Sequence, residues 1–250
     1  MTATPNLLLF IMLPYVALGL FLLVTIQRYR RSPFTYSSLS SQFLENREHF
    51  WGLVSFHYGI LFVLTGHLVG LLVPRQVILW NSKPLRLYVL EISALIFALM
   101  ALVGMCAAVH RRLTLTKTRM VTSRADWIVL ALLVLQIAAG IYISVVYPWG
   151  SSWYAASAAP YLWSLFTFRP DASYLTTMPF GVKLHIVNAW LIVAFFPFTR
   201  LVHALVAPFP YLWRKPEVVR WYGIRRRKPQ AAVAPGLPQA LARPAKAGRG

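Results

Sequence analysis

The sequence predicts an all-α integral membrane protein with five transmembrane helices, on three observations. Of its 250 residues, 58% are hydrophobic and only 12% are charged, whereas soluble domains carry about 25% charged residues. Five apolar segments reach the roughly 20 residues that a helix needs to cross a bilayer core. The lysines and arginines lie mainly between these segments and in the C-terminal tail, so the net charge of +19 does not indicate a nucleic-acid-binding protein.

The predicted helices cover residues 7–26, 51–73, 87–109, 127–146 and 184–206. The first is predicted to be a retained helix and not a signal peptide, because MTATPN has no basic residue and no small-residue cleavage motif follows. The fifth contains Pro197, which we expect to kink it. Before it, the aromatic loop 147–183 is predicted to form a short helix at the membrane boundary.

Positively charged residues predict how the helices are oriented in the membrane. Twenty of the 25 lysines and arginines lie in 27–50, in 110–126 and from residue 200 onward. We therefore expect an outside (periplasmic) N-terminus and a cytoplasmic C-terminus for a transmembrane domain of residues 1–206. The basic segment 207–228 is predicted to dock cytoplasmic partners, and the Ala-, Pro- and Gly-rich segment 229–250 to be disordered.

Two of the helices carry a pair of histidines each, His57 and His67 in the second and His185 and His203 in the fifth. Ionisable groups inside a membrane are costly, so they indicate function. The two helices run in opposite directions, and matching depths therefore pair His67 with His185 near the outer side. By the same argument His57 pairs with His203 near the cytoplasmic side.

Each pair could ligate one haem iron from both faces, which is typical of electron-transfer haems. The single cysteine excludes the C-x-x-C-H attachment of a c-type haem. Along straight helices the spacing is about 15 Å from His57 to His67 and about 27 Å from His185 to His203, a mean that suits two stacked haems. His57 and His67 would lie some 80° apart around their helix, so that helix must twist or cross obliquely.

Other residues have two interpretations each. Gly66 and Gly70 form a G-x-x-x-G pair, which indicates either close helix packing or space for a porphyrin. Arg200, Arg111 and Arg112 either bind haem propionates or only anchor the cytoplasmic helix ends.

Three segments resemble a known family: FHYGILFVLTGHLVGLLVP (56–74), KLHIVNAW (183–190) and FPFTRLVH (196–203). They resemble the second and fifth helices of the membrane (gamma) subunit of respiratory nitrate reductase, a dihaem cytochrome b. The similarity extends to about residue 220. The resemblance implies two haem b groups, a distal one on His67 and His185 and a proximal one on His57 and His203.

The resemblance also implies that a quinol, menaquinol or ubiquinol, is oxidised near the distal haem in the cell (inner) membrane. Electrons would pass to an iron–sulfur (beta) subunit and a molybdenum-containing catalytic (alpha) subunit that reduces nitrate. The family's quinol-binding lysine is replaced here by Leu87, which leaves Arg86 and Lys83 as candidate contacts. Glu91 is either a proton acceptor from quinol or an acid that reaches the outer surface.

Three alternatives remain open at this point. One is a related dihaem subunit of a sulfite-reduction or heterodisulfide-reductase-like complex. Another is a subunit of a nitrite oxidoreductase, with electrons flowing outward. A third, from a different class, is a haem-free membrane transporter or assembly factor, and haem content would distinguish it from the others.

Overall fold

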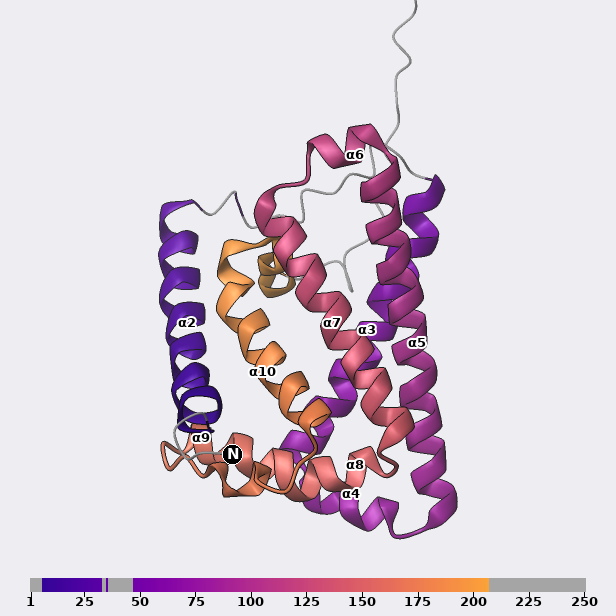
Figure 1. Ribbon diagram of the computed structural model, residues 1–250, viewed down its shortest axis with the longest axis vertical. Helices are drawn as coiled ribbons and strands as arrows, with labels where there is room; N and C mark the ends of the chain where they lie inside the picture. Colours follow the sequence, from indigo (N-terminus) through magenta and orange to yellow (C-terminus); the bar gives the residue numbers. More distant parts are fainter. Residues whose placement is uncertain (1–5, 33–34, 36–46, 207–250) are drawn as a thin grey trace, which may run out of the picture. The chain divides into compact units, whose positions relative to one another are not determined.

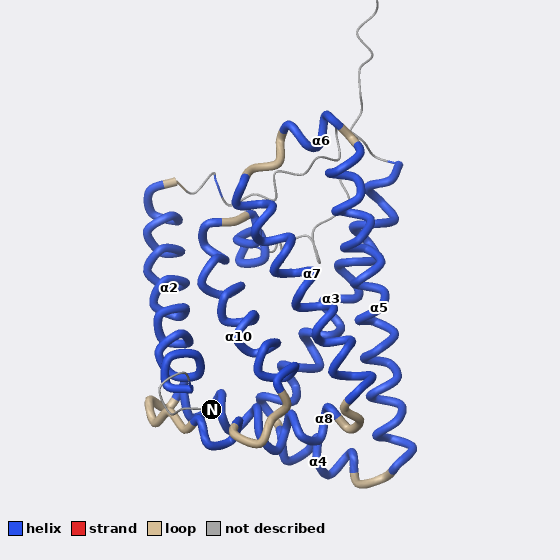
Figure 2. The backbone as a smooth tube through the Cα atoms, viewed as in Figure 1, coloured by secondary structure: helices blue, strands red, loops and turns tan. Residues whose placement is uncertain are grey.

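The computed structural model describes residues 6–32, 35 and 47–206, with only the backbone described over 47–51. Within these ranges the regular structure is entirely helical and includes five helices long and apolar enough to cross a membrane (Figures 1 and 2). The prediction of an all-helical, multi-pass membrane protein is therefore confirmed. The predicted docking segment 207–228 and tail 229–250 lie outside the described residues. The long helices are α2 (Leu13–Arg31, after the π-helical turn η1, Leu8–Met12), α3 (Arg47–Leu72), α5 (Pro84–Thr114), α7 (Arg124–Val146) and α10 (Phe180–Phe195).

The long helices pack in the order α3, α5, α7, α10, α2. Short helices gather at one end of them, and α6 (Thr116–Met120) lies at the other (Figure 1). The short helices at the first end are α4 (Pro74–Asn81), α8 (Gly150–Trp153), η3 (Tyr154–Ala158), α9 (Ala159–Phe166) and η4 (Ala172–Leu175). The 147–183 loop was predicted to form one short helix, and it instead forms three in direct succession, α8, η3 and α9, followed by η4.

Glycines bring α3 and α5 into close contact. A Cβ atom added to Gly104 would lie 2.4 Å from the backbone nitrogen of Phe56, and one added to Gly59 would lie 2.6 Å from that of Ala101. No side chain fits at these distances, so the helix backbones themselves meet. One face of α3 is thus fixed against α5. His57 is two residues from Gly59 and therefore lies on a different face of the helix.

Each of the five long helices extends beyond its predicted range at one end or both, and the sequence at the start explains this for two of them. Pro84, whose backbone geometry suits a first helical position, begins α5 three residues early. Helix α7 begins at Arg124 because Ser123 and Asp126 form a capping box, each side chain bonding the other's backbone N–H. The apolar middle part of these helices was predicted correctly, whereas their charged first and last turns were not.

The fifth helix departs most from the prediction of a continuous span over 184–206. The α-helix ends at Phe195, and the chain continues as 3-10 helices η5 (Phe196–Phe198) and η6 (Arg200–Val206). Pro197 has no N–H to continue the α-helical hydrogen bonds, so the expected kink becomes a change of helix type. Arg28 of α2 donates to the carbonyls of Pro197 at 2.6 Å and Thr199 at 3.1 Å.

Candidate cofactor site

The structure brings the four histidines together in the two pairs predicted by depth. The ring centres of His67 and His185 lie 6.4 Å apart, with 30° between the ring planes. Those of His57 and His203 lie 6.2 Å apart, with 68° between the planes. Helix α3 supplies one ring to each pair, while α10 and η6 supply the partners. Helices α3 and α10 are not among the closely packed pairs of described helices, so the rings meet between them.

These separations would suit two histidines that hold the same iron. Imidazole–metal bonds of about 2 Å, with about 1 Å from each nitrogen to its ring centre, place two such ring centres roughly 6 Å apart. A bare metal ion held by protein alone takes more ligands, and no group of three or more His, Cys, Asp or Glu that could hold one occurs in the described part of the chain. Two histidines suit an iron whose other four ligands come from a porphyrin.

Three of the four imidazoles are oriented by the backbone of their own helix. Nδ1 of His57 donates to the carbonyl of Leu53 and Nδ1 of His67 to that of Val63, both at 2.8 Å. In the 3-10 segment η6, Nδ1 of His203 donates to the carbonyl of Arg200 at 2.6 Å. A carbonyl can only accept, so Nδ1 carries the proton. Each neutral ring therefore keeps the lone pair on Nε2, as an iron ligand requires.

His185 is held differently, by a neighbouring helix. Its Nε2 lies 3.1 Å from the amide nitrogen of Gln136 in α7. Asn188 of α10 donates to the Gln136 amide oxygen at 2.7 Å and to the carbonyl of Leu132 at 3.0 Å. Neither amide was predicted from the sequence to belong to the site. The signal for Gln136 was that residues 127–146 contain no other amide or charged side chain.

The two glycines near His67 have different surroundings. A Cβ atom at Gly66 would meet nothing within 4 Å among the described residues. One at Gly70 would lie 2.7 Å from the ring of Tyr154, so Gly70 makes room for that ring. The Tyr154 ring lies edge-on to His67, and its hydroxyl donates to the His67 carbonyl at 3.1 Å. Burial raises the pKa of Tyr154 to about 12, so it remains a hydrogen-bond donor at neutral pH. Gly70 thus supports His67 through packing, and Gly66 leaves open space beside it.

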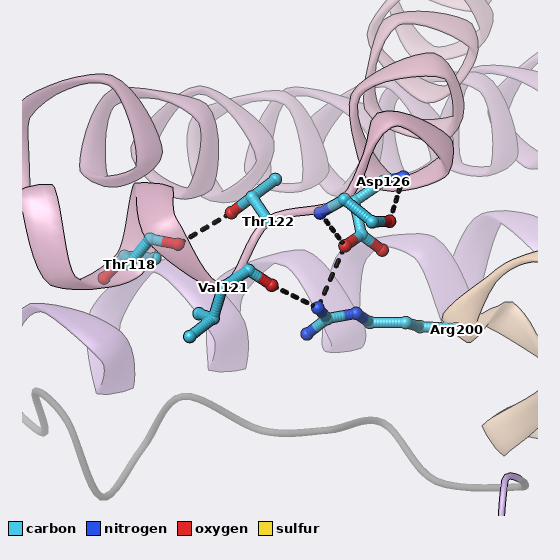
Figure 3. Close-up of polar contacts among 6 residues, drawn as sticks. Thr118, Val121, Thr122, Asp126 and Arg200 are labelled. Atoms are coloured by element: carbon cyan, nitrogen blue, oxygen red, sulfur yellow. Dashed lines mark hydrogen bonds and ion pairs between the residues drawn. The ribbon is translucent and has the colours of Figure 1, made fainter.

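The arginines proposed for propionate binding lie near the His57–His203 end. Arg200 forms an ion pair with Asp126 at 2.9 Å and donates to the carbonyl of Val121 at 2.7 Å (Figure 3). Arg111 is buried, and Arg112 donates to the carbonyl of Ala108 at 3.0 Å. The ion pair fixes Arg200 to the start of α7. Asp126 is a site residue that was not predicted from the sequence, although its capping spacing to Ser123 was visible.

The quinol-site candidates lie at the opposite end, around the start of α5. Lys83 and Arg86 are exposed, and the Arg86 guanidinium lies 5.1 Å from the centre of the Trp80 ring. Glu91 is half-buried, and its Oε1 accepts hydrogen bonds from the backbone N–H of Ser151 at 2.8 Å and from the Ser151 hydroxyl. This carboxylate therefore joins α5 to the first turn of α8.

Comparison with known proteins decides the family. The model of the nitrate reductase gamma subunit family matches residues 6–222. The chain belongs to this family. It is 34% identical to the respiratory nitrate reductase 2 gamma chain of Escherichia coli over 83% of this chain and 93% of that one. It is 31% identical to the nitrate reductase gamma chain of Bacillus subtilis, over 83% and 95%. The resemblance stated from the sequence is thus confirmed, and the chain is a membrane subunit of a respiratory nitrate reductase complex.

Proposed function

We propose that this gamma subunit is a dihaem cytochrome b that connects a quinol at the outer face of the membrane with the cytoplasmic iron–sulfur and molybdenum-containing subunits. The observation that supports this is the pairing of His67 with His185 and of His57 with His203 at ring separations of 6.4 and 6.2 Å. A haem b, when bound at either pair, supplies a one-electron redox centre. Two such pairs, at two depths about 15 Å apart along α3, suit electron transfer across the bilayer.

The protein's own contribution is to hold the ligands. Backbone carbonyls fix the Nδ1 protons of His57, His67 and His203, which pre-organises the Nε2 lone pairs. A haem iron held by both histidines of a pair would have no position left for oxygen or nitrate. This is why we expect the chain alone to reduce no nitrate.

The proposed orientation places the N-terminus outside and the His67–His185 pair near the outer surface, where quinol protons would be released. Arg86, or Lys83 in its place, is the candidate contact for the quinol. Glu91 is close to that helix end, and its bonds to Ser151 favour an anchoring role over proton acceptance. On the cytoplasmic side, the basic segment 207–228 is the proposed docking site for the beta and alpha subunits.

A difference spectrum of membranes containing the complete complex tests the proposal. A quinol analogue should produce b-type haem bands, and added nitrate should remove them rapidly. His67→Ala should abolish the reduction by quinol. His110→Ala is the matched control, because His110 is an exposed histidine outside both pairs.

Three results would contradict different parts of the proposal. Bands that ignore nitrate would retain the dihaem protein but assign it another acceptor. An unchanged spectrum in His67→Ala would exclude that residue as a ligand. No b-type band even with dithionite would reject the haems altogether and leave a haem-free membrane protein.

A further inference from the structure

Gln136 and Asn188 are two amide side chains in the interior of the transmembrane helices. Resting on the proposed function, we infer that they are positioning residues that set the orientation of His185 and the redox potential of the haem it ligates. Gln136 is the hydrogen-bond partner of the imidazole, and Asn188 fixes the direction of the Gln136 amide.

The contacts define a directed chain across the α7–α10 interface. Asn188 can only donate through its amide nitrogen, which bonds the Leu132 carbonyl at 3.0 Å and Gln136 Oε1 at 2.7 Å. Oε1 of Gln136 is therefore the acceptor and its amide nitrogen the donor. That nitrogen lies 3.1 Å from Nε2 of His185, which must accept.

The chain of amides differs from what helix packing alone requires. Asn188 is 1% exposed, and a buried amide in lipid surroundings is costly unless it is hydrogen-bonded. An apolar pair would join α7 to α10 without that cost. The amides instead end at the one histidine of the four whose ring is not bonded to a carbonyl of its own helix in the described contacts.

The nitrogen atoms of His185 indicate how the amides serve a bound iron. Its Nδ1 is buried and has no hydrogen-bond partner among the described residues. When an iron takes Nε2, Nδ1 must carry the proton and needs an acceptor. An iron on Nε2 would displace the Gln136 amide nitrogen, which contacts that atom in the structure. We assign the acceptor role at Nδ1 to the Gln136 amide oxygen, because it has two lone pairs and Asn188 uses only one of them. An amide, which both donates and accepts, is thus suited to hold this ring with and without the cofactor.

The expected consequence is a specific change of redox potential. An acceptor at the Nδ1 proton makes the imidazole a more basic ligand, which favours the oxidised iron. Removing it with Gln136→Leu should raise the potential of the His67–His185 haem. We expect the ratio of oxidised to reduced haem at a fixed potential to fall about tenfold, which for a one-electron couple is about 59 mV.

The test is a spectroscopic redox titration of membranes containing the complete complex, with the His57–His203 haem as internal standard. Gln136→Leu should raise the redox potential of only one component of the titration, the one that is missing in His67→Ala. Gln136→Glu keeps an oxygen acceptor, so its potential should equal that of the wild type or lie below it. Leu135→Ala, at a 41% exposed neighbour on the same helix, controls for general effects on α7.

Each outcome either supports or overturns the inference. Loss of the His67–His185 haem alone in Gln136→Leu supports it, as a raised potential does. Equal occupancy and potentials in Gln136→Leu and the wild type overturn it. If Gln136→Leu loses both haems, Gln136→Glu decides: a raised potential overturns the inference, and an unchanged or lowered one supports it. Failure to find two b-type haems in the wild type would instead refute the proposed function.

Discussion

Replacing Asp126 by alanine should destabilise the protein at the end that holds the His57–His203 pair. The Asp126 side chain is 7% exposed and that of Arg200 is 25% exposed, with 2.9 Å between them. Removing one partner of a buried ion pair costs roughly 3–5 kcal/mol. Because Arg200 is partly exposed and can regain water, we expect about 3 kcal/mol for the pair. Loss of the bond between the Asp126 carboxylate and the Ser123 N–H, 2.8 Å long, adds about 1 kcal/mol.

Thermal denaturation of the detergent-solubilised complex, followed through the haem bands, measures this effect. At about 2–4 °C per kcal/mol the midpoint should fall by roughly 10 °C. Asp171→Asn is a control, since that exposed carboxylate caps only the short helix η4. In a double-mutant cycle, Asp126→Ala and Arg200→Ala should together cost at least about 1 kcal/mol less than the sum of the single changes. Additive costs would show that the two side chains do not stabilise each other and would refute the reasoning.

Helix packing, the helix break and the quinol site give three further predictions. Gly59→Val should prevent assembly or haem incorporation, because α5 backbone atoms lie 2.6 Å from the place that a Cβ atom would take. Gly66→Ala should leave the packing of α3 on α5 intact, and equal haem yields from the two variants would contradict this. Arg28→Met should release the carbonyl of Pro197 and reduce occupancy of the nearby haem before that of the other. The amplitudes of the two components in a redox titration of the b-type bands measure this, and equal loss of both would contradict it. Glu91→Gln should keep most quinol oxidation, and a loss of about a hundredfold would make Glu91 the proton acceptor.

The histidine pairing was predictable because it depends on topology alone. Two antiparallel helices that each have a ligand at two depths can be matched by depth in only one way, and the break at Pro197 did not alter that match. The spacing of about 27 Å between His185 and His203 assumed a straight α-helix with about 3.6 residues per turn throughout. That assumption does not hold, because His203 lies in the 3-10 helix η6.

The interactions that orient the ligands were not predictable in the same way. The partners of Asn188 and Arg200 are 52 to 79 residues distant in the sequence, and no local spacing specifies them. Tyr154, which packs on His67, comes from a loop whose composition indicated only a membrane boundary. Depth in the bilayer orders residues along one axis, whereas contacts between helices require their rotation and separation as well.

The two histidine pairs therefore rest on different kinds of support. His67 and His185 lie on regular helices, and the direction of the His185 ring depends on side-chain amides. His203 lies after the helix break, where its position depends on Arg28 holding the carbonyls and on Arg200 being tied to Asp126. Changes in the amide chain should thus alter the potential of one haem while leaving the fold intact. Changes around Pro197 should alter the stability of the other site, because the position of His203 depends on the course of the backbone after the helix break.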